Sequence, residues 1–216
     1  MTKLVIFDLD GTLLNTVKDL GNATNYALRR CGYPEKPADE YNILCGRGII
    51  NMFKGAMPAE EVNEENVQRM KEIFLPYYDQ HKSEFTRPYP GIVELLSALK
   101  AKGIKMGVAS NKYQEGAEKL VAEFFPEISF LKILGQRDGQ PIKPDPAIVE
   151  QIMAMDSNIK KENVVYCGDT NVDMQTGINA GVRTVGVTWG FRSREELEAY
   201  HPWLIADRAE QILENI

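Results

Sequence analysis

The sequence predicts an α/β fold in which a doubly wound parallel sheet, a Rossmann-like core, carries an inserted all-helical cap domain. Three observations lead to this prediction. Short apolar segments rich in β-branched residues recur along the chain. Such segments are typical of strands that are buried on both faces of a parallel sheet. Segments whose apolar residues have helical spacing separate them. One long stretch, residues 15–85, has amphipathic patterns but no convincing strand.

The first expected strand is residues 4–7 (LVIF), near the N-terminus. Four similar segments follow at residues 106–109, 130–134, 164–167 and 184–187. A helix is expected over residues 92–99, another over 117–124, and a third after Pro146, which suits a first helical turn. From residue 86 onward strands and helices alternate regularly, which predicts parallel βαβ units.

The cap is expected to interrupt this core. We assign residues 1–14 and 86–216 to the core and residues 15–85 to the cap. A stripe of apolar residues at helical spacing supports a helical cap; it consists of Val67, Met70, Ile73 and Phe74. Residues 87–91 (RPYPG) are turn-forming and stiff, as a hinge or linker would be.

Composition excludes several classes of protein. The chain of 216 residues has 25 Lys and Arg against 31 Asp and Glu, a net charge of −6, which disfavours a nucleic-acid partner. Its three cysteines form no CxxC pair, so neither zinc nor a disulfide framework is indicated. The apolar run before Asp8 is too short for a signal peptide, and no run is long enough to span a membrane. We expect a cytoplasmic protein without a membrane partner, either a monomer or a homodimer.

Carboxylates stand at the ends of two expected strands. Asp8 and Asp10 are two residues apart on extended chain, so their side chains face one crevice beyond the sheet. A turn shaped by Asp and Gly is the alternative; a calcium loop is excluded because Gly11 stands at the fourth position rather than the sixth. Asp169 and Asp173 are four apart at the start of a helix, where one of them could be a simple N-cap. Four carboxylates from two strand ends favour Mg²⁺.

Two further strand ends add a hydroxyl and a cation. Ser110 follows the second strand and is suited to a phosphate oxygen, although such a serine is often only a helix N-cap. Lys143 follows the third strand on a loop that two prolines make stiff. The position of this lysine is therefore more restricted than that of most surface lysines. The joint occurrence of these groups at one sheet edge argues against a separate structural explanation for each.

These blocks, in this order, resemble the haloacid dehalogenase superfamily of phosphohydrolases. The matching segments are residues 8–13 (DLDGTL), 110–112 (SNK), 143–144 (KP) and 168–170 (GDT) with Asp173. Within the superfamily the chain is most similar to phosphoglycolate phosphatases. That similarity lies in residues 88–91 (PYPG), 179–182 (NAGV) and 185–190 (VGVTWG).

The resemblance implies a Mg²⁺-dependent phosphatase that hydrolyses a small phosphate monoester, 2-phosphoglycolate, through an aspartyl-phosphate. Asp8 would be the nucleophile and Asp10 the general acid and base. The resemblance also implies that phosphate is bound by Ser110, Asn111 and Lys143. It implies that the metal is held by Asp8, Asp169 and Asp173, and by Asp10 through its backbone carbonyl. Asn111 and Lys112 are expected to orient the loop and are given no chemical step.

Substrate choice is expected to lie in the cap. Arg47 stands in a glycine-flanked turn, residues 44–49, and could pair with a substrate carboxylate; the alternative is a solvent-facing arginine. The function alternatives are a sugar-phosphate phosphomutase, a pyrophosphatase or a nucleotidase of the same superfamily. A phospho-receiver signalling domain is disfavoured because it has no use for a large cap or for Asp10.

Overall fold

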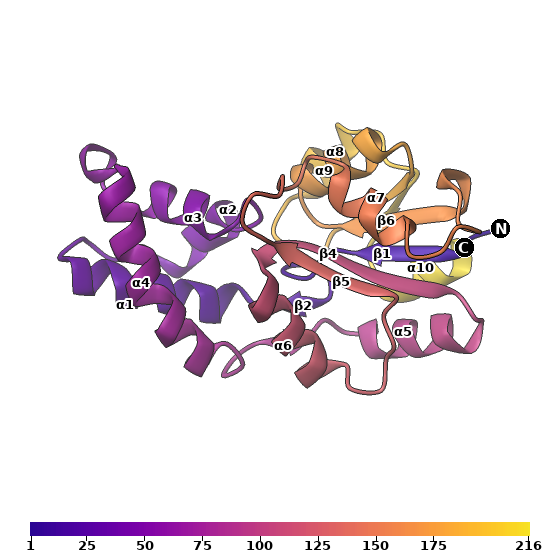
Figure 1. The fold of residues 1–216 in the computed structure, drawn as a ribbon, viewed down its shortest axis with the longest axis horizontal. Helices are drawn as coiled ribbons and strands as arrows, with labels where there is room; N and C mark the ends of the chain where they lie inside the picture. The colour runs from indigo at the N-terminus through magenta and orange to yellow at the C-terminus, as the bar shows by residue number, and fades with distance from the viewer.

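In a computed structural model that describes residues 1–216, the apolar segments form a six-stranded sheet of order β5-β4-β1-β6-β7-β8 (Figure 1). Every strand pairing in this sheet is parallel, so the predicted α/β core is confirmed. The strands are β1 (Leu4–Phe7), β4 (Lys105–Tyr113), β5 (Lys132–Gln136), β6 (Val164–Gly168), β7 (Arg183–Val187) and β8 (Leu204–Ala206). Sequence patterns missed β8 because three residues are too few to show a period.

Helices cover both faces of the sheet, as Figure 1 shows. Side chains alternate along β1: Val5 and Phe7 join one buried cluster, and Leu4 and Ile6 join the other. The first cluster is completed by α5 (Ile92–Ala101), α6 (Gln114–Phe124) and α10 (Ala209–Asn215), and the second by α7 (Ala147–Met153) and α8 (Asn171–Ala180). The short helix α9 (Arg194–Glu198) follows β7, and the 3₁₀ turn η3 (Lys161–Asn163) precedes β6. Pro146 directly precedes α7 instead of lying within its first turn.

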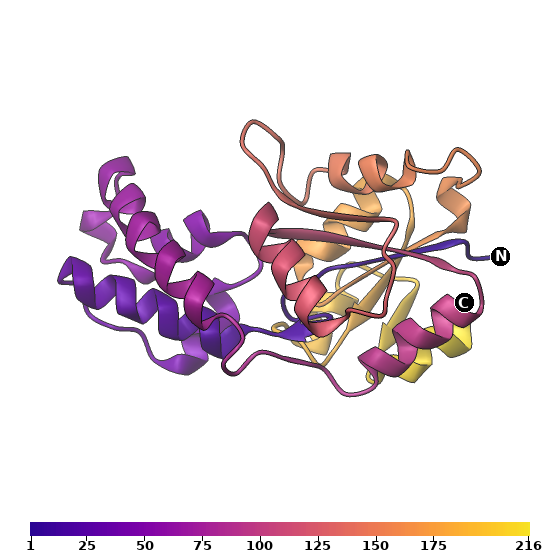
Figure 2. The same ribbon diagram turned by 60° about the horizontal axis from the view of Figure 1, so that its bottom comes forward.

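A second group of helices forms the lobe on the left of Figures 1 and 2. Its members are α1 (Val17–Cys31), η1 (Ala38–Glu40), α2 (Tyr41–Leu44), α3 (Ile49–Ala56), η2 (Ala59–Glu61) and α4 (Glu64–His81). They share a hydrophobic cluster of their own, which includes Phe53, Phe74 and Tyr78. We propose the same division of the chain as above, with residues 15–85 as the cap. None of the helices has both the length and the apolar character needed to cross a membrane.

The two connections between cap and core pair with each other. Strand β2 (Leu14–Asn15) lies antiparallel to β3 (Arg87–Pro88), so part of the segment expected to be a stiff hinge or linker is one half of a two-stranded ribbon. Just inside the cap, the buried Asp19 carboxylate accepts hydrogen bonds from the Phe85 N–H at 3.0 Å and the Thr86 N–H at 2.8 Å. It also accepts one from the Thr86 hydroxyl at 2.8 Å. Asp19 therefore fastens the start of α1 to the returning chain.

Replacing Asp19 with alanine should lower the free energy of unfolding by about 2–4 kcal/mol, because three buried donors lose a charged acceptor. Urea unfolding followed by circular dichroism measures the change. Asp39→Ala, on an exposed turn of the cap, is the matched control and should stay within about 0.5 kcal/mol of the parent. Equal stability of the two variants would show that the Asp19 contacts do not hold the linkers together.

Candidate active site

The candidate site lies where the carboxyl ends of three adjacent strands meet. β1 is flanked by β4 and β6, and Phe7 is paired with Val108 on one side and Cys167 on the other. Asp8 directly follows β1, and its N–H donates to the Cys167 carbonyl at 2.9 Å. Asp169 directly follows β6. Parallel strands in register thus deliver both carboxylates to the same edge of the sheet.

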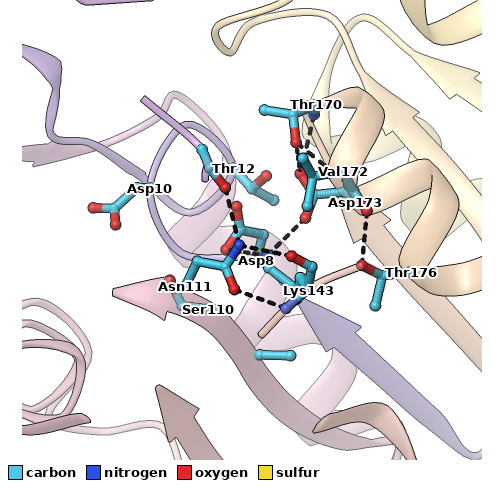
Figure 3. Close-up of polar contacts among 12 residues, drawn as sticks. Asp8, Asp10, Thr12, Ser110, Asn111, Lys143, Thr170, Val172, Asp173 and Thr176 are labelled. Carbon is cyan, nitrogen blue, oxygen red and sulfur yellow. Dashed lines mark hydrogen bonds and ion pairs between the residues drawn. The ribbon is translucent and has the colours of Figure 1, made fainter. Parts of the chain in front are cut away.

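Three carboxylates gather at this edge. Ligand oxygens of Asp8, Asp169 and Asp173 lie within 4.8 Å of one another, and all three residues are buried. The Lys143 ammonium enters the same cluster, 2.9 Å from Asp8 Oδ1 and 2.7 Å from Asp173 Oδ1. Figure 3 shows Lys143 facing Asp8 and Asp173. The Lys143 ammonium also donates to the Tyr166 hydroxyl at 3.1 Å, and that hydroxyl donates to Asp173 Oδ1 at 3.1 Å.

Burial and mutual repulsion shift the titration of these groups. Burial, followed by the charge of Asp173, raises the pKa of Asp8 to about 7, although Lys143 opposes the shift. Burial and the charges of Asp173 and Asp8 hold the pKa of Asp169 well above its ordinary value. Burial alone would lower the pKa of Lys143, but Asp173 and Asp8 outweigh it and raise that pKa above its usual range. The lysine therefore stays charged, and Asp8 and Asp169 favour their protonated forms when no other cation is present.

The donor set fits a hard divalent cation. When all three carboxylates are ionised, the one ammonium leaves two negative charges uncompensated, and Asp8 Oδ1 is buried without an aligned hydrogen bond. Asp173 is less available than the other two: its Oδ2 accepts from the Thr170 N–H at 3.0 Å and hydroxyl at 2.6 Å, and its Oδ1 is taken by Lys143 and Tyr166. Asp8 and Asp169 accept fewer hydrogen bonds than Asp173 and keep more capacity for a divalent cation, while Asp173 closes a capping box and bonds Lys143.

Asp169 is held from both sides. Its Oδ1 accepts a hydrogen bond from the Thr12 hydroxyl and its Oδ2 one from the Phe191 N–H, each at 2.8 Å. Gly11 and Gly190 lie against this carboxylate so closely that a Cβ would come within 2.2 Å and 2.3 Å of its atoms. Any other residue would displace Asp169, so two glycines are required here for space.

Asp10 stands apart from the cluster, as Figure 3 shows. Its carboxylate accepts a hydrogen bond from the Thr16 hydroxyl at 2.7 Å and pairs with the Lys112 ammonium at 3.0 Å. Lys112 is buried and also lies 4.8 Å from the centre of the Tyr78 ring of the cap. Of the four aspartates expected to hold the metal, Asp10 alone keeps its side chain out of the carboxylate cluster.

Ser110 and Asn111 belong to β4 itself, which continues to Tyr113 through a register shift after Ala109. Sequence patterns ended this strand at residue 109. Ser110 lines the pocket beside Asp8. The Asn111 side chain is occupied by protein groups: its Oδ1 accepts from the Lys143 N–H at 2.9 Å, and its Nδ2 donates to the Gly46 carbonyl at 3.2 Å. Asn111 therefore positions Lys143 and the cap, and its amide is not left free for phosphate.

A pocket opens between core and cap. The core supplies its polar lining, Asp8, Asp10, Ser110, Asn111 and Lys112, and the cap supplies Leu20, Cys45, Gly46, Gly48, Ile49 and Met52. Gly46 and Gly48 have φ of 107° and 80° and pack against Thr170 and Asn111 of the core. Residues 45–48, which we call the cap loop, thus close over the site.

The structure does not bring Arg47 into this pocket. Its side chain is exposed and lines a separate hollow, which Asn51 of the cap and Asn171 and Arg192 of the core also line. Two glycines with positive φ turn the loop so that its backbone, and not the arginine, faces Asp8. The cation that does reach the pocket is Lys112. Sequence reasoning gave Lys112 no chemical step, although its place directly after Ser110 and Asn111 at a strand end was a usable signal.

Known proteins resemble the chain along nearly its whole length. Residues 5–187 match the family model described as haloacid dehalogenase-like hydrolase. Phosphoglycolate phosphatase of Aquifex aeolicus is 31% identical over 189 residues, which are 88% of this chain and 86% of the relative. The enzyme of the same name from Vibrio parahaemolyticus is 27% identical over 99% of this chain and 96% of its own length. A crystal structure of a candidate phosphoglycolate phosphatase from Lactobacillus delbrueckii subsp. bulgaricus superposes with a TM-score of 0.89 at 33% identity, covering 99% and 98% of the two chains.

The carboxylate cluster predicts an inverted dependence of stability on pH in metal-free protein. The pKa of Asp8 is about 7 in the folded chain against 3.8 for the free side chain. The stability that protonation of Asp8 contributes is therefore fully present below the unfolded pKa of 3.8 and is lost as pH rises through the folded pKa of about 7. The raised pKa of Asp169 acts in the same direction. With a chelator present, the free energy of unfolding should fall by on the order of 2–3 kcal/mol between pH 5 and pH 8. The melting temperature should fall with it.

Magnesium should reverse this trend, because the cation replaces the protons. The rise in melting temperature on adding Mg²⁺ should be larger at pH 8 than at pH 5. Asp8→Asn removes the carboxylate whose pKa is raised to about 7 and serves as the control for all other groups; the fall of its melting temperature with pH should be shallower. A Mg²⁺ shift of the same size at both pH values would contradict the assignment of the cluster to a metal.

Proposed function

The chain belongs to the haloacid dehalogenase-like hydrolase family, and we propose that it is a Mg²⁺-dependent phosphatase acting on a small phosphate monoester, 2-phosphoglycolate. The observation that carries the proposal is the buried Asp8 carboxylate, which lines the pocket and has the Lys143 ammonium 2.9 Å from its Oδ1. Relatives named phosphoglycolate phosphatase, which match almost the whole chain, support the substrate. The three free cysteines support a cytoplasmic location, because thiols stay reduced there.

Asp8 is the proposed nucleophile. One of its oxygens attacks phosphorus, the bond from phosphorus to the ester oxygen breaks, and an aspartyl-phosphate remains. Water then attacks that phosphorus, the bond to Asp8 breaks, and inorganic phosphate leaves. Asp8 and Asp169 would hold Mg²⁺, whose positive charge would offset the repulsion between carboxylate and phosphate. The buried setting of Asp8 excludes competing water during the first displacement.

Asp10 is the proposed general acid and base. Its carboxylate lines the same pocket and lies outside the metal cluster, so it can exchange protons with a group on the leaving side. It gives a proton to the alkoxide as the ester bond breaks and takes one from the attacking water afterwards. The Thr16 hydroxyl and the Lys112 ammonium fix its orientation through bonds of 2.7 Å and 3.0 Å.

Lys143 and Ser110 grip the transferring phosphoryl group. The Lys143 ammonium stays charged because two carboxylates face it, and the charge that spreads over phosphoryl oxygens in the transition state needs such a partner. The Ser110 hydroxyl lies at the pocket wall beside Asp8. Asn111 holds the Lys143 backbone with a 2.9 Å hydrogen bond, which fixes the lysine relative to β4.

Lys112 is the proposed partner of the substrate carboxylate. It is the cation of the pocket lining, and it lies on the Asp10 side, where the leaving group must sit. The rest of that side consists of cap groups that are mostly apolar, such as Leu20, Ile49 and Met52. A leaving group that is small and carries one negative charge fits this lining, because a larger polar one would leave buried groups unpaired.

Replacing Asp8 with asparagine should reduce phosphate release from 2-phosphoglycolate at least about a thousandfold, because an amide cannot act as the anionic nucleophile. The fold should survive, since the side chain keeps its shape. Steady-state phosphate release with Mg²⁺, on protein whose mass confirms the substitution, measures the loss. Activity of Asp8→Asn near that of the parent would remove Asp8 from the mechanism.

The choice between Lys112 and Arg47 can be tested with two matched substrates. 2-Hydroxyethyl phosphate has the same size and an alkoxide leaving group but no carboxylate. Lys112→Met should cut the preference for 2-phosphoglycolate over this analogue roughly ten- to a hundredfold, the worth of one charge-assisted hydrogen bond. Arg47→Ala should leave the preference within about twofold, because its side chain is exposed outside the pocket.

Measuring kcat/KM for both esters separates recognition of the acid from damage to Asp10, since an effect on Asp10 lowers both rates together. A parent enzyme with no preference for 2-phosphoglycolate over sugar phosphates, nucleotides and pyrophosphate would refute the proposed substrate. The family and the phosphatase chemistry would then stand with another ester.

A further inference from the structure

Four consecutive residues, Trp189–Gly190–Phe191–Arg192, join the candidate metal ligand to the cap, and the proposed reaction gives them no role. We call them the strap. They follow β7 and precede α9, so their backbone belongs to the core. Their side chains, however, reach into both lobes. This placement singles them out as a link between the site and the part of the cap that covers it.

The core end of the strap is fixed to the site itself. The Phe191 N–H donates to Asp169 Oδ2 at 2.8 Å, and the Trp189 indole N–H donates to the Thr12 carbonyl at 3.0 Å. Gly190 lies flat against Asp169. The strap backbone therefore cannot move without disturbing Asp169 and the loop that follows Asp8.

The cap end of the strap grips the chain that leads into the cap loop. The Phe191 ring packs into the hydrophobic cluster of the cap, although its backbone belongs to the core. The Arg192 guanidinium donates hydrogen bonds to three cap carbonyls, those of Asn42, Ile43 at 3.0 Å and Cys45 at 3.1 Å. These carbonyls lie at the end of α2, which Figure 1 shows on the side of the cap that faces the core.

The chemistry of this contact is specific. The last carbonyls of a helix have no partner within the helix, and a planar guanidinium can bind several of them at once. Cys45, the third of the bound residues, is also the first residue of the cap loop and lines the pocket. On the opposite side of the loop, Asn111 donates to the Gly46 carbonyl at 3.2 Å. The loop is thus held between Arg192 and Asn111.

We propose that Arg192 is a positioning residue that holds the cap loop in its closed place over the pocket. Arg192 does not touch the reacting groups; it acts through the carbonyls of α2 and the Cys45 backbone. The Asp169–Phe191 hydrogen bond sets the position of Arg192 relative to the site. The effect on catalysis rests on the proposed phosphatase function, whereas the effect on the cap loop does not.

Removing the guanidinium should loosen the cap loop and leave the phosphate grip unchanged. Because Asp8, Lys143 and Ser110 all belong to the core, Arg192→Ala should raise KM for 2-phosphoglycolate roughly ten- to a hundredfold, the worth of the lost hydrogen bonds. It should change kcat by less than about threefold. Arg192→Lys keeps the charge and up to three donors, so its KM should lie between those of the parent and Arg192→Ala.

The experiment compares Arg192→Ala, Arg192→Lys and Arg194→Ala. Arg194 is the matched control: it lies two residues further along, and its guanidinium pairs with Asp207 and Glu198, both of the core. Amide hydrogen exchange of residues 41–48, measured without substrate or metal, is the first readout. Exchange there should accelerate at least tenfold in Arg192→Ala, less in Arg192→Lys, and remain at the parent rate in Arg194→Ala.

Unchanged exchange over residues 41–48 in Arg192→Ala, with KM within twofold of the parent, would overturn the proposal. A fall in kcat with unchanged KM would also overturn it, since that points to damage at Asp169. If Arg192→Ala fails to fold, Arg192→Lys decides by the same two readouts. If the parent hydrolyses no phosphate ester, the proposed function fails, and the exchange rates still decide whether Arg192 holds the loop.

Discussion

The close approach of three buried carboxylates is the constraint on which the rest of the structure depends. Asp8, Asp169 and Asp173 bring oxygens within 4.8 Å of one another, and such a group is stable only if positive charge or protons compensate it. Lys143 supplies one charge, and its backbone is in turn held by Asn111. Tyr166, Thr170, Thr12 and the Phe191 N–H supply hydrogen bonds to the remaining oxygens. The same electrostatic strain that demands these partners makes the edge receptive to a divalent cation.

Most of the core could be predicted from the sequence because five of its six strands contain a short apolar segment, and because a parallel sheet brings all strand ends to one edge. Asp8, Asp169 and Lys143 could be singled out by that argument alone. The sequence indicated that Lys112 stands near a strand end, but it did not show which of Arg47 and Lys112 reaches the pocket. Their orientation depends on the positive φ of Gly46 and Gly48 and on how the cap packs against β4, and no local pattern encodes either. The β2–β3 ribbon escaped notice for a related reason: its two halves are separated by the whole cap.

Chemistry and enclosure come from different parts of the chain. The core provides every charged group of the pocket, and the cap provides its apolar and backbone lining. Polar links between the two lobes include Asn111 to Gly46, Arg192 to the end of α2, the Thr16 hydroxyl to Asp10, and the Tyr113 hydroxyl to Asp79 at 2.5 Å. Each lobe has a buried apolar cluster of its own, and Phe191 of the core packs into that of the cap. The relative position of the lobes therefore depends on these polar links together with the Phe191 ring.

The paired connections between the lobes have a consequence for how such a protein can diversify. Chain leaves the core at Leu14–Asn15 and returns at Arg87–Pro88, and the two segments lie side by side as neighbours in one ribbon. A module whose entry and exit are adjacent can be exchanged for another, or shortened to a hairpin, without rethreading any strand of the sheet. The catalytic edge and the module that selects what reaches it are therefore able to change independently, and recombination at this ribbon offers a route to new specificities on an unaltered chemical platform.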